Sequence, residues 1–315
     1  MTALGPNSEN EIVLVEAKAD GRVLAYASDR DPVGDWSFDG VIERLFVADA
    51  DGNGMDDIFV AIREEDDERL RILLQGRDGE WEEGQTLAVP IPSALRVDVV
   101  GGRRLLFLGS TDSLRIFERS AAGTYVAAQE LAGVDLLGIA DVTCDGVADL
   151  FVSDGTADRV DLLRTDSSGT FQLVEGFAAG AQPVGVAAWT GGKNVISVVG
   201  LVDGRVSSHF IQPDGKARVL ETIRPWGDEV GRLLALERID IPCAGIGSWV
   251  AVREDGGVAL GSVDSSGRMA VLEHLPPVAE TVAPLSEVRD LDGDGAEDLL
   301  IATGSRVVIR KGLCR

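Results

Sequence analysis

Three acidic loops in the sequence have the residue types and the spacing of a site for a hard divalent cation. In the loop from Asp290 to Asp298, carboxylates stand at positions 1, 3, 5 and 9, and a glycine at position 6 permits a sharp bend. Ca²⁺ binds such cages of oxygens, with the backbone carbonyl at position 7 as a further ligand. Loops 49–57 and 141–149 repeat the pattern. The spacing predicts three calcium sites, with ligands Asp49, Asp51, Asn53, Met55 and Asp57; Asp141, Thr143, Asp145, Val147 and Asp149; and Asp290, Asp292, Asp294, Ala296 and Asp298.

The residues after these loops predict β-hairpins and a structural ion. A helical EF-hand would carry Glu at position 12. That position is Val60, Val152 or Ile301, each inside an apolar, strand-like run. All four side-chain positions are used as ligands, which favours a structural ion over a catalytic one. Without it, several carboxylates within a few Å would repel one another and splay the hairpin.

The other units have weaker loops. The segment from Asp240 to Ser248 keeps the first aspartate and the glycine but has too few oxygens, so we interpret it as a degenerate copy. The loops of residues 97–104 and 189–194 are short and lack a carboxylate array. The three cysteines form no CxxC pair, which argues against a disulfide framework or a zinc site.

Composition limits the partners. The chain has 53 acidic and 29 basic residues and a formal charge of -24, which disfavours nucleic acid and anionic membrane. No apolar run approaches the ~20 residues that span a bilayer, so no membrane insertion is expected. Residues 1–10 are polar and lack the apolar core of a secretory leader, which leaves the compartment open.

Seven β-type apolar runs recur along the chain. The second residues of these runs are separated by 46, 47, 45, 45, 54 and 50 positions. In each unit further short runs rich in Val, Leu and Ile alternate with turn-forming residues, and no stretch has a sustained helical period. The second residues of the seven runs are Ile12, Ile58, Leu105, Leu150, Val195, Trp249 and Leu299.

Four antiparallel strands in each unit of about 45 residues are typical of a β-propeller. We therefore predict an all-β, seven-bladed β-propeller of four-stranded antiparallel blades that forms a single domain over residues 1–315. The first unit lacks its first run and the last lacks its fourth, so the terminal blades are expected to be incomplete or to be completed by residues 1–11, by residues after 315 or by a partner chain. The predicted units are 11–43, 44–93, 94–135, 136–182, 183–232, 233–284 and 285–315.

The three acidic loops resemble the calcium loops of FG-GAP/VCBS-type repeats, which form the seven-bladed propeller of integrin α-subunits and of many bacterial surface proteins. Through the repeat spacing the resemblance covers nearly the whole chain. The Phe-Gly and Gly-Ala-Pro signatures are not legible, which favours a bacterial-type repeat protein. The resemblance implies a structural Ca²⁺, cell adhesion or partner binding, and an extracellular, periplasmic or cell-surface location.

The expected function is a protein-interaction or adhesion module and not an enzyme. A protein or glycan ligand is expected on the face opposite the calcium loops, which would include residues 84–93, 224–232 and 276–284 and the acidic turn 63–68. Trp226 is the candidate contact residue, with capping of a blade seam as its alternative role. A carbohydrate-active lyase or hydrolase and a lectin remain alternatives, although His209 and His274 lie near no nucleophile motif and are interpreted as solvated strand residues.

Overall fold

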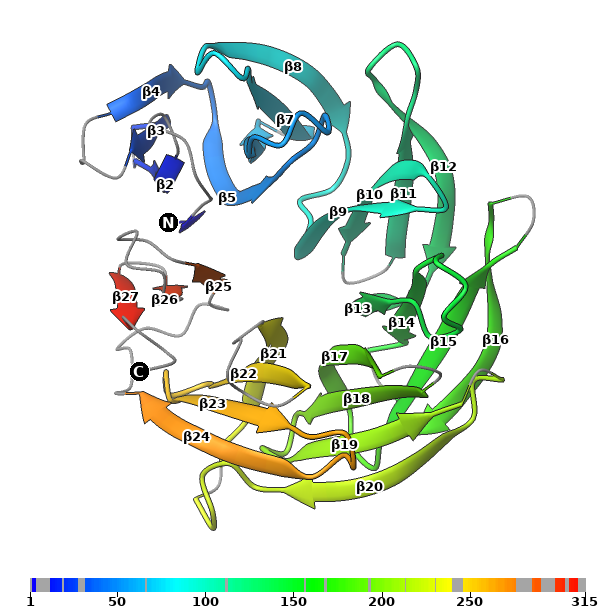
Figure 1. Cartoon of the computed structure of the whole chain (residues 1–315). Coiled ribbons are helices and arrows are strands. Elements are labelled where there is room, and N and C mark those ends of the chain that lie inside the picture. The colour runs from blue at the N-terminus through cyan, green and yellow to red at the C-terminus, as the bar shows by residue number, and fades with distance from the viewer. Residues whose placement is uncertain are drawn as a thin grey trace.

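The computed structural model shows a ring of seven antiparallel β-sheets (Figure 1). It describes residues 2–3, 12–18, 20–27, 32–65, 67–110, 113–155, 157–166, 169–191, 194–212, 214–229, 231–239, 246–275, 285–289, 298–303 and 306–310. Over these ranges the chain forms strands and turns, and it contains no helix long and apolar enough to cross a membrane. The all-β, seven-bladed propeller predicted from the repeat spacing is confirmed.

Each sheet is one blade whose strands pair in chain order. The first strand of each blade lies nearest the ring centre, and in blades 1 to 6 the fourth lies at the rim (Figure 1). Blade 1 consists of β1 (Thr2–Ala3), β2 (Ile12–Ala17), β3 (Arg22–Ala27) and β4 (Pro32–Ser37); blade 2 of β5 (Val41–Ala48), β6 (Asp57–Glu64), β7 (Asp67–Gln75) and β8 (Trp81–Ala88); blade 3 of β9 (Ala94–Val100), β10 (Arg103–Gly109), β11 (Ser113–Arg119) and β12 (Tyr125–Ala132).

The second half of the ring continues this order. Blade 4 consists of β13 (Asp135–Ala140), β14 (Asp149–Ser153), β15 (Arg159–Thr165) and β16 (Phe171–Ala178); blade 5 of β17 (Pro183–Gly191), β18 (Asn194–Leu201), β19 (Val206–Ile211) and β20 (Ala217–Ile223); blade 6 of β21 (Leu233–Ile239), β22 (Gly247–Arg253), β23 (Val258–Val263) and β24 (Met269–Leu275); blade 7 of β25 (Leu285–Arg289), β26 (Asp298–Thr303) and β27 (Arg306–Arg310).

The hydrophobic core lies between adjacent blades. Both faces of the second strands are covered, and every residue of β14 is buried, as are the first six of β6. One core cluster joins Leu105 and Phe107 of blade 3 to Leu150 and Phe171 of blade 4. Because a four-stranded sheet has two faces, only neighbours on both sides can bury these runs. The strands at the rim instead alternate between exposed and partly buried residues, as in β24.

The rim strands share a β-bulge. In blades 1 to 6 the register between the third and fourth strands shifts near the middle of the pair. A bulge bends the strand and increases its right-handed twist. The same twist therefore recurs in each complete blade.

The ring closes where the two ends of the chain meet. Thr2 and Ala3 pair with Val15 and Leu14, so residues from the N-terminal segment supply the innermost strand of blade 1. This agrees with the hypothesis that residues 1–11 complete that blade. β1 also contacts β25 and β26 of blade 7 (Figure 1). Blade 7 has three strands in the described part of the chain.

Candidate metal-binding hairpin

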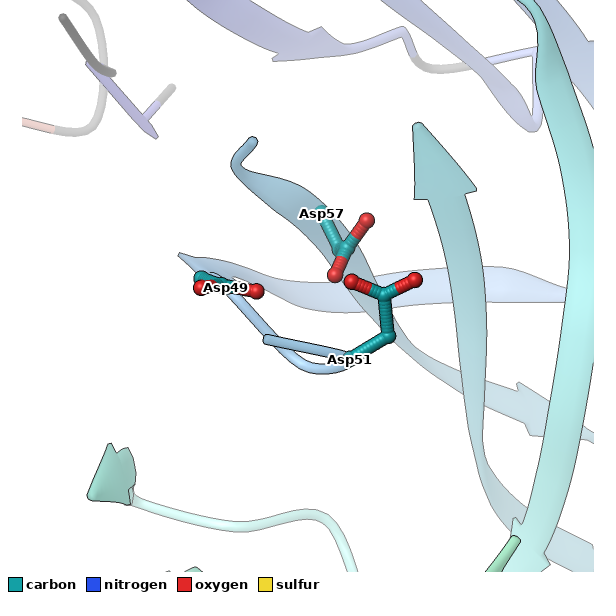
Figure 2. Close-up of side chains that lie close together, drawn as sticks. All are labelled: Asp49, Asp51 and Asp57. Atoms are coloured by element: carbon teal, nitrogen blue, oxygen red, sulfur yellow. The ribbon is translucent and has the colours of Figure 1, made fainter. Parts of the chain in front are cut away.

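The β5–β6 hairpin of blade 2 brings three carboxylates together. Asp49 follows the last residue of β5, Asp51 lies in the connecting loop, and Asp57 is the first residue of β6. One oxygen of each lies within 4.8 Å of the others. Figure 2 shows the three carboxylates around the space at the mouth of the loop. The sequence spacing therefore places these predicted ligands in one site.

Backbone amides within the loop hold the carboxylates in place. The N–H groups of Gly52 and Gly54 donate to Asp49 over 2.6 and 3.2 Å, and the Asn53 N–H donates to Asp51 over 2.9 Å. The φ angle of Gly54 is +86°, a left-handed conformation that glycine adopts without the steric cost of a Cβ. The sequence thus forms a tight turn in which successive acidic side chains fold back over the loop.

Asn53 and Met55 complete the predicted ligand set of this loop. The Asn53 side-chain amide donates to the Gln75 carbonyl over 2.7 Å, and its oxygen accepts the Met55 N–H over 2.6 Å. Asn53 therefore ties the loop to the end of β7. An amide oxygen has two lone pairs, so the bond from the Met55 N–H leaves one of them for a cation.

Asp57 is fully buried, and its environment is unusual for a charged group. The Ala50 and Gln75 N–H groups donate to its two oxygens over 2.7 and 2.8 Å. Burial raises the pKa of Asp57 to about 7, and the nearby charges of Asp51 and Asp49 act in the same direction. A carboxylate oxygen carries more than one lone pair, so these bonds leave Asp57 able to accept a cation.

Two residues of blade 3 brace this hairpin, and neither was found from the sequence. The Arg104 guanidinium donates to the Asp49 carbonyl over 2.6 Å and lies 3.7 Å from the Asp49 carboxylate. The Tyr125 hydroxyl donates to the Ala50 carbonyl over 2.7 Å. An alignment of the units offers one signal, since Arg104 occupies loop position 9, where blades 2 and 4 have aspartate.

The β13–β14 hairpin of blade 4 has the same backbone plan but a different carboxylate arrangement. Asp141 accepts the N–H groups of Asp145 and Gly146 over 3.2 and 2.8 Å, and the buried Asp149 accepts the Val142 N–H over 2.9 Å. Burial raises the pKa of Asp149 to about 6.

Its acidic groups nevertheless do not form a comparable cluster. Among the described residues, Asp49, Asp51 and Asp57 of blade 2 are the acidic, histidine or cysteine side chains that form a group of three or more with ligand atoms within 4.8 Å of one another. The Asp145 carboxylate instead accepts the Val147 N–H over 2.8 Å, and the Thr143 hydroxyl donates to Asp141 over 3.3 Å. The five predicted ligands at residues 141–149, which include Thr143 and the Val147 carbonyl, therefore stay a prediction.

The third predicted site lies largely outside the described residues. Asp290, Asp292, Asp294 and Ala296 are not described, and neither are residues 240–245 of the degenerate loop. Asp298 is the first residue of β26, as Asp57 is of β6 and Asp149 of β14. The common position of these three aspartates was expected from the repeat.

Trp226 lies in the connection from β20 to β21 and packs against blade 6. The Arg253 guanidinium lies 5.1 Å from its ring centroid, and the His274 ring lies 6.3 Å from it. His274 is in turn hydrogen-bonded to the Pro225 carbonyl over 2.7 Å. Trp226 is half-buried against the core cluster of blades 5 and 6. These contacts favour the capping role over that of a partner contact.

His209 corrects the expectation of a solvated strand histidine. Its side chain is buried in β19, hydrogen-bonded to the Ser207 hydroxyl over 2.8 Å and packed 4.9 Å from the Phe177 ring of blade 4. Burial lowers its pKa to about 4. The third strand of a blade is covered by its neighbours, so polar residues there become interior ones.

The face opposite the acidic hairpin has a shallow hollow. Asp57 begins β6 and Glu64 ends it, so the β6–β7 turn lies at the far end of the strand. The hollow has a volume of about 540 Å³ and is lined by Arg63, Glu65, Glu68, Ala88, Val89 and Pro90. The acidic turn and part of the segment 84–93 are therefore adjacent, as expected, although residues 84–88 belong to β8 and only the remainder forms the connection.

No family model and no curated protein sequence matches the chain. Solved structures do match it. A protein from Lactobacillus plantarum is 13% identical, with 93% of this chain and 88% of that chain covered and a TM-score of 0.62. The periplasmic gluconolactonase PpgL of Pseudomonas aeruginosa is 16% identical (89% and 84% covered, TM-score 0.61), as is BBS1N in its complex with ARL6DN (94% and 84% covered, TM-score 0.61).

These similarities define the class of the protein as a β-propeller. At such low identity they concern the fold alone. The resemblance to FG-GAP/VCBS repeats remains a prediction from the loops.

Proposed function

We propose that the protein is a calcium-stabilised β-propeller that acts as a protein-interaction module. The observation that carries the proposal is the convergence of Asp49, Asp51 and Asp57 at the tip of one hairpin. Carboxylate oxygens are the ligands that Ca²⁺ prefers. Asp49, Asp51 and Asp57 would hold the ion, with Asn53 and the Met55 carbonyl as further oxygen donors.

The donor set fits a hard cation because all its side-chain donors are oxygens. Like charges this close destabilise the folded hairpin, most of all where a carboxylate is buried. The Arg104 guanidinium offsets part of this charge from one side of Asp49. A bound cation would supply the remaining counter-charge, and it would stabilise the folded state because the unfolded chain lacks the cage.

Calcium titration tests this directly. At a free Ca²⁺ concentration of about 100 times Kd, binding should add ~2.7 kcal/mol to the unfolding free energy. We expect millimolar Ca²⁺ to raise the Tm in differential scanning fluorimetry and excess EDTA to lower it. The Asp51→Asn variant should lose most of this response. Asp145→Asn in blade 4 is the matched control and should lose less of it, and equal melting of the wild type in Ca²⁺ and EDTA would contradict the proposal.

The hollow opposite the hairpin is the proposed partner surface. It combines an apolar floor from Ala88, Val89 and Pro90 with charged walls, a composition suited to a protein ligand. BBS1N, which has the same fold, was solved in complex with ARL6DN, so a protein partner has a precedent in this architecture. The net charge of -24 favours a basic partner.

A pull-down with the whole chain as bait tests this surface. Captured proteins should be lost with Ala88→Glu, at an exposed residue that lines the hollow, and retained with Val126→Glu, at an exposed valine on β12 of blade 3. Capture that is equal for the two variants would place the partner elsewhere. The similarity to a gluconolactonase concerns fold alone, and hydrolysis of a sugar lactone by the purified chain would favour the enzyme alternative.

A further inference from the structure

Arg104 stands where blades 2 and 4 have an aspartate. Leu105 aligns with Ile58 and Leu150 in the repeat, so the preceding residue is position 9 of the loop. In blade 3 the loop itself is reduced to Gly101 and Gly102, with φ of +57° and +78° between β9 and β10. Two left-handed residues are typical of a type I′ hairpin, which is too short to form an ion cage.

The shortened hairpin directs the Arg104 side chain onto the acidic loop of the neighbouring blade. Its Nη1 donates to the Asp49 carbonyl over 2.6 Å and lies 3.7 Å from Asp49 Oδ2. The guanidinium also packs on the loop backbone, since a Cβ added to Gly52 would lie 2.7 Å from Nη2. Both charged side chains are partly buried, with 23% of Arg104 and 28% of Asp49 exposed.

We infer that Arg104 is a built-in counter-charge that sets the calcium affinity of the blade 2 hairpin. This inference rests on the proposed calcium site. Without the ion, the guanidinium offsets part of the carboxylate charge and holds the loop through the Asp49 carbonyl. With the ion, two cations share one carboxylate, and because arginine stays protonated the repulsion is permanent. Arg104 therefore lowers the affinity for Ca²⁺ and couples blade 3 to the site.

The neighbour of the blade 4 hairpin lacks this device. Blade 5 has Asn194, an uncharged residue, at the corresponding position. Arg103, beside Arg104 in the sequence, reaches the other way: it donates to the Gly169 carbonyl of blade 4 over 2.7 Å and pairs with Glu118. Arg103 is therefore a control of equal charge on the same strand, because its partners are Gly169 and Glu118 and not the acidic loop of blade 2.

The test is isothermal titration of the whole chain with CaCl₂, combined with melting in EDTA. Arg104→Met keeps most of the side-chain volume and removes the charge. It should tighten Ca²⁺ binding up to about fivefold, because removing one partly exposed charge has effects of up to this order. Its Tm in EDTA should fall relative to the wild type. Arg104→Lys should retain near wild-type affinity, and Arg103→Met should leave the affinity unchanged.

Combining Arg104→Met with Asp51→Asn tests whether Arg104 acts on calcium binding at the blade 2 site. In the Asp51→Asn variant, Arg104→Met should no longer change calcium binding. A wild type that binds no Ca²⁺ would overturn the proposed function and this inference with it. A wild type that binds Ca²⁺ with an Arg104→Met variant of equal or weaker affinity would overturn the inference alone and leave the calcium site in place.

Discussion

The acidic hairpins of blades 2 and 4 share aspartate, glycine and aspartate at loop positions 1, 6 and 9 but differ in how their carboxylates are arranged. Both begin with an aspartate that accepts backbone N–H groups and end with a buried aspartate at the start of the second strand. Within the part of the chain that the structure describes, the blade 2 hairpin is braced by a guanidinium and a phenol from its neighbour, whereas the positive charge that acts on Asp149 is Arg164 of its own blade. Arg104 and Tyr125 reach it from blade 3, whereas blade 5 offers Asn194 and Ala217 at the corresponding positions. The adjacent blade therefore adds contacts to the site that the loop itself does not supply.

The largest expected difference between the two hairpins is in how the free energy of unfolding depends on pH when EDTA has removed Ca²⁺. Burial raises the pKa of Asp57 to about 7 and that of Asp149 to about 6, from 3.8. The folded state then holds these protons more tightly than the unfolded state does. The stability they contribute is fully present below about pH 4 and is lost as the pH rises through the folded pKa. Between pH 5 and 8, Asp57 should account for a loss of roughly 3 kcal/mol and Asp149 for about 1 kcal/mol.

Urea unfolding in EDTA at several pH values measures these contributions as the difference between the wild type and each Asp→Asn variant. That difference cancels groups common to both proteins, including His209, whose lowered pKa makes stability fall with acidification. Asp57→Asn should flatten the profile more than Asp149→Asn does. Equal profiles would mean that the two hairpins are electrostatically alike.

The sequence predicted the repeat and the loops but not the contacts between units. Seven apolar runs at near-constant spacing indicate seven stacked sheets, because each run must be covered on both faces. The spacing of Asp49, Asp51 and Asp57 likewise determines that they meet within one turn. By contrast, Arg104 contacts Asp49 across a separation of 55 residues, and the burial of His209 depends on a neighbouring blade. A sequence pattern within one unit does not contain such information.

A smaller effect is expected from the phenol that braces the blade 2 hairpin. Tyr125→Phe removes the hydrogen bond to the Ala50 carbonyl and leaves that buried acceptor without this donor. The unfolding free energy should fall by about 1 kcal/mol. Because Ala50 follows Asp49 directly, calcium affinity should fall as well. Calorimetry on the variant measures both, and an unchanged affinity would show that the carbonyl contact supports the fold without positioning the ligands.

Phe171 provides the control for that substitution. It follows its turn glycine by two residues, as Tyr125 does, and has no hydroxyl. Each is held by a glutamine of the preceding rim strand. Gln85 donates to the Tyr125 carbonyl and Gln129 donates to the Phe171 carbonyl, each over 2.9 Å. Phe171→Leu should therefore lower stability through lost packing and leave calcium binding to blade 2 unchanged.

An effect of similar size on stability is expected from the glycine at position 6 of each loop. Gly54 and Gly146 have φ of +86° and +84°, and a Cβ added at either would meet no atom within 4 Å. Replacement by alanine therefore carries only the cost of a left-handed conformation, about 1 kcal/mol at each site. In EDTA the two variants should be equally destabilised by urea. In Ca²⁺ the Gly54→Ala variant should lose more, because any relaxation of the turn moves Asp49 and Asp51 away from the ion, and equal losses would mean that calcium does not distinguish the two hairpins.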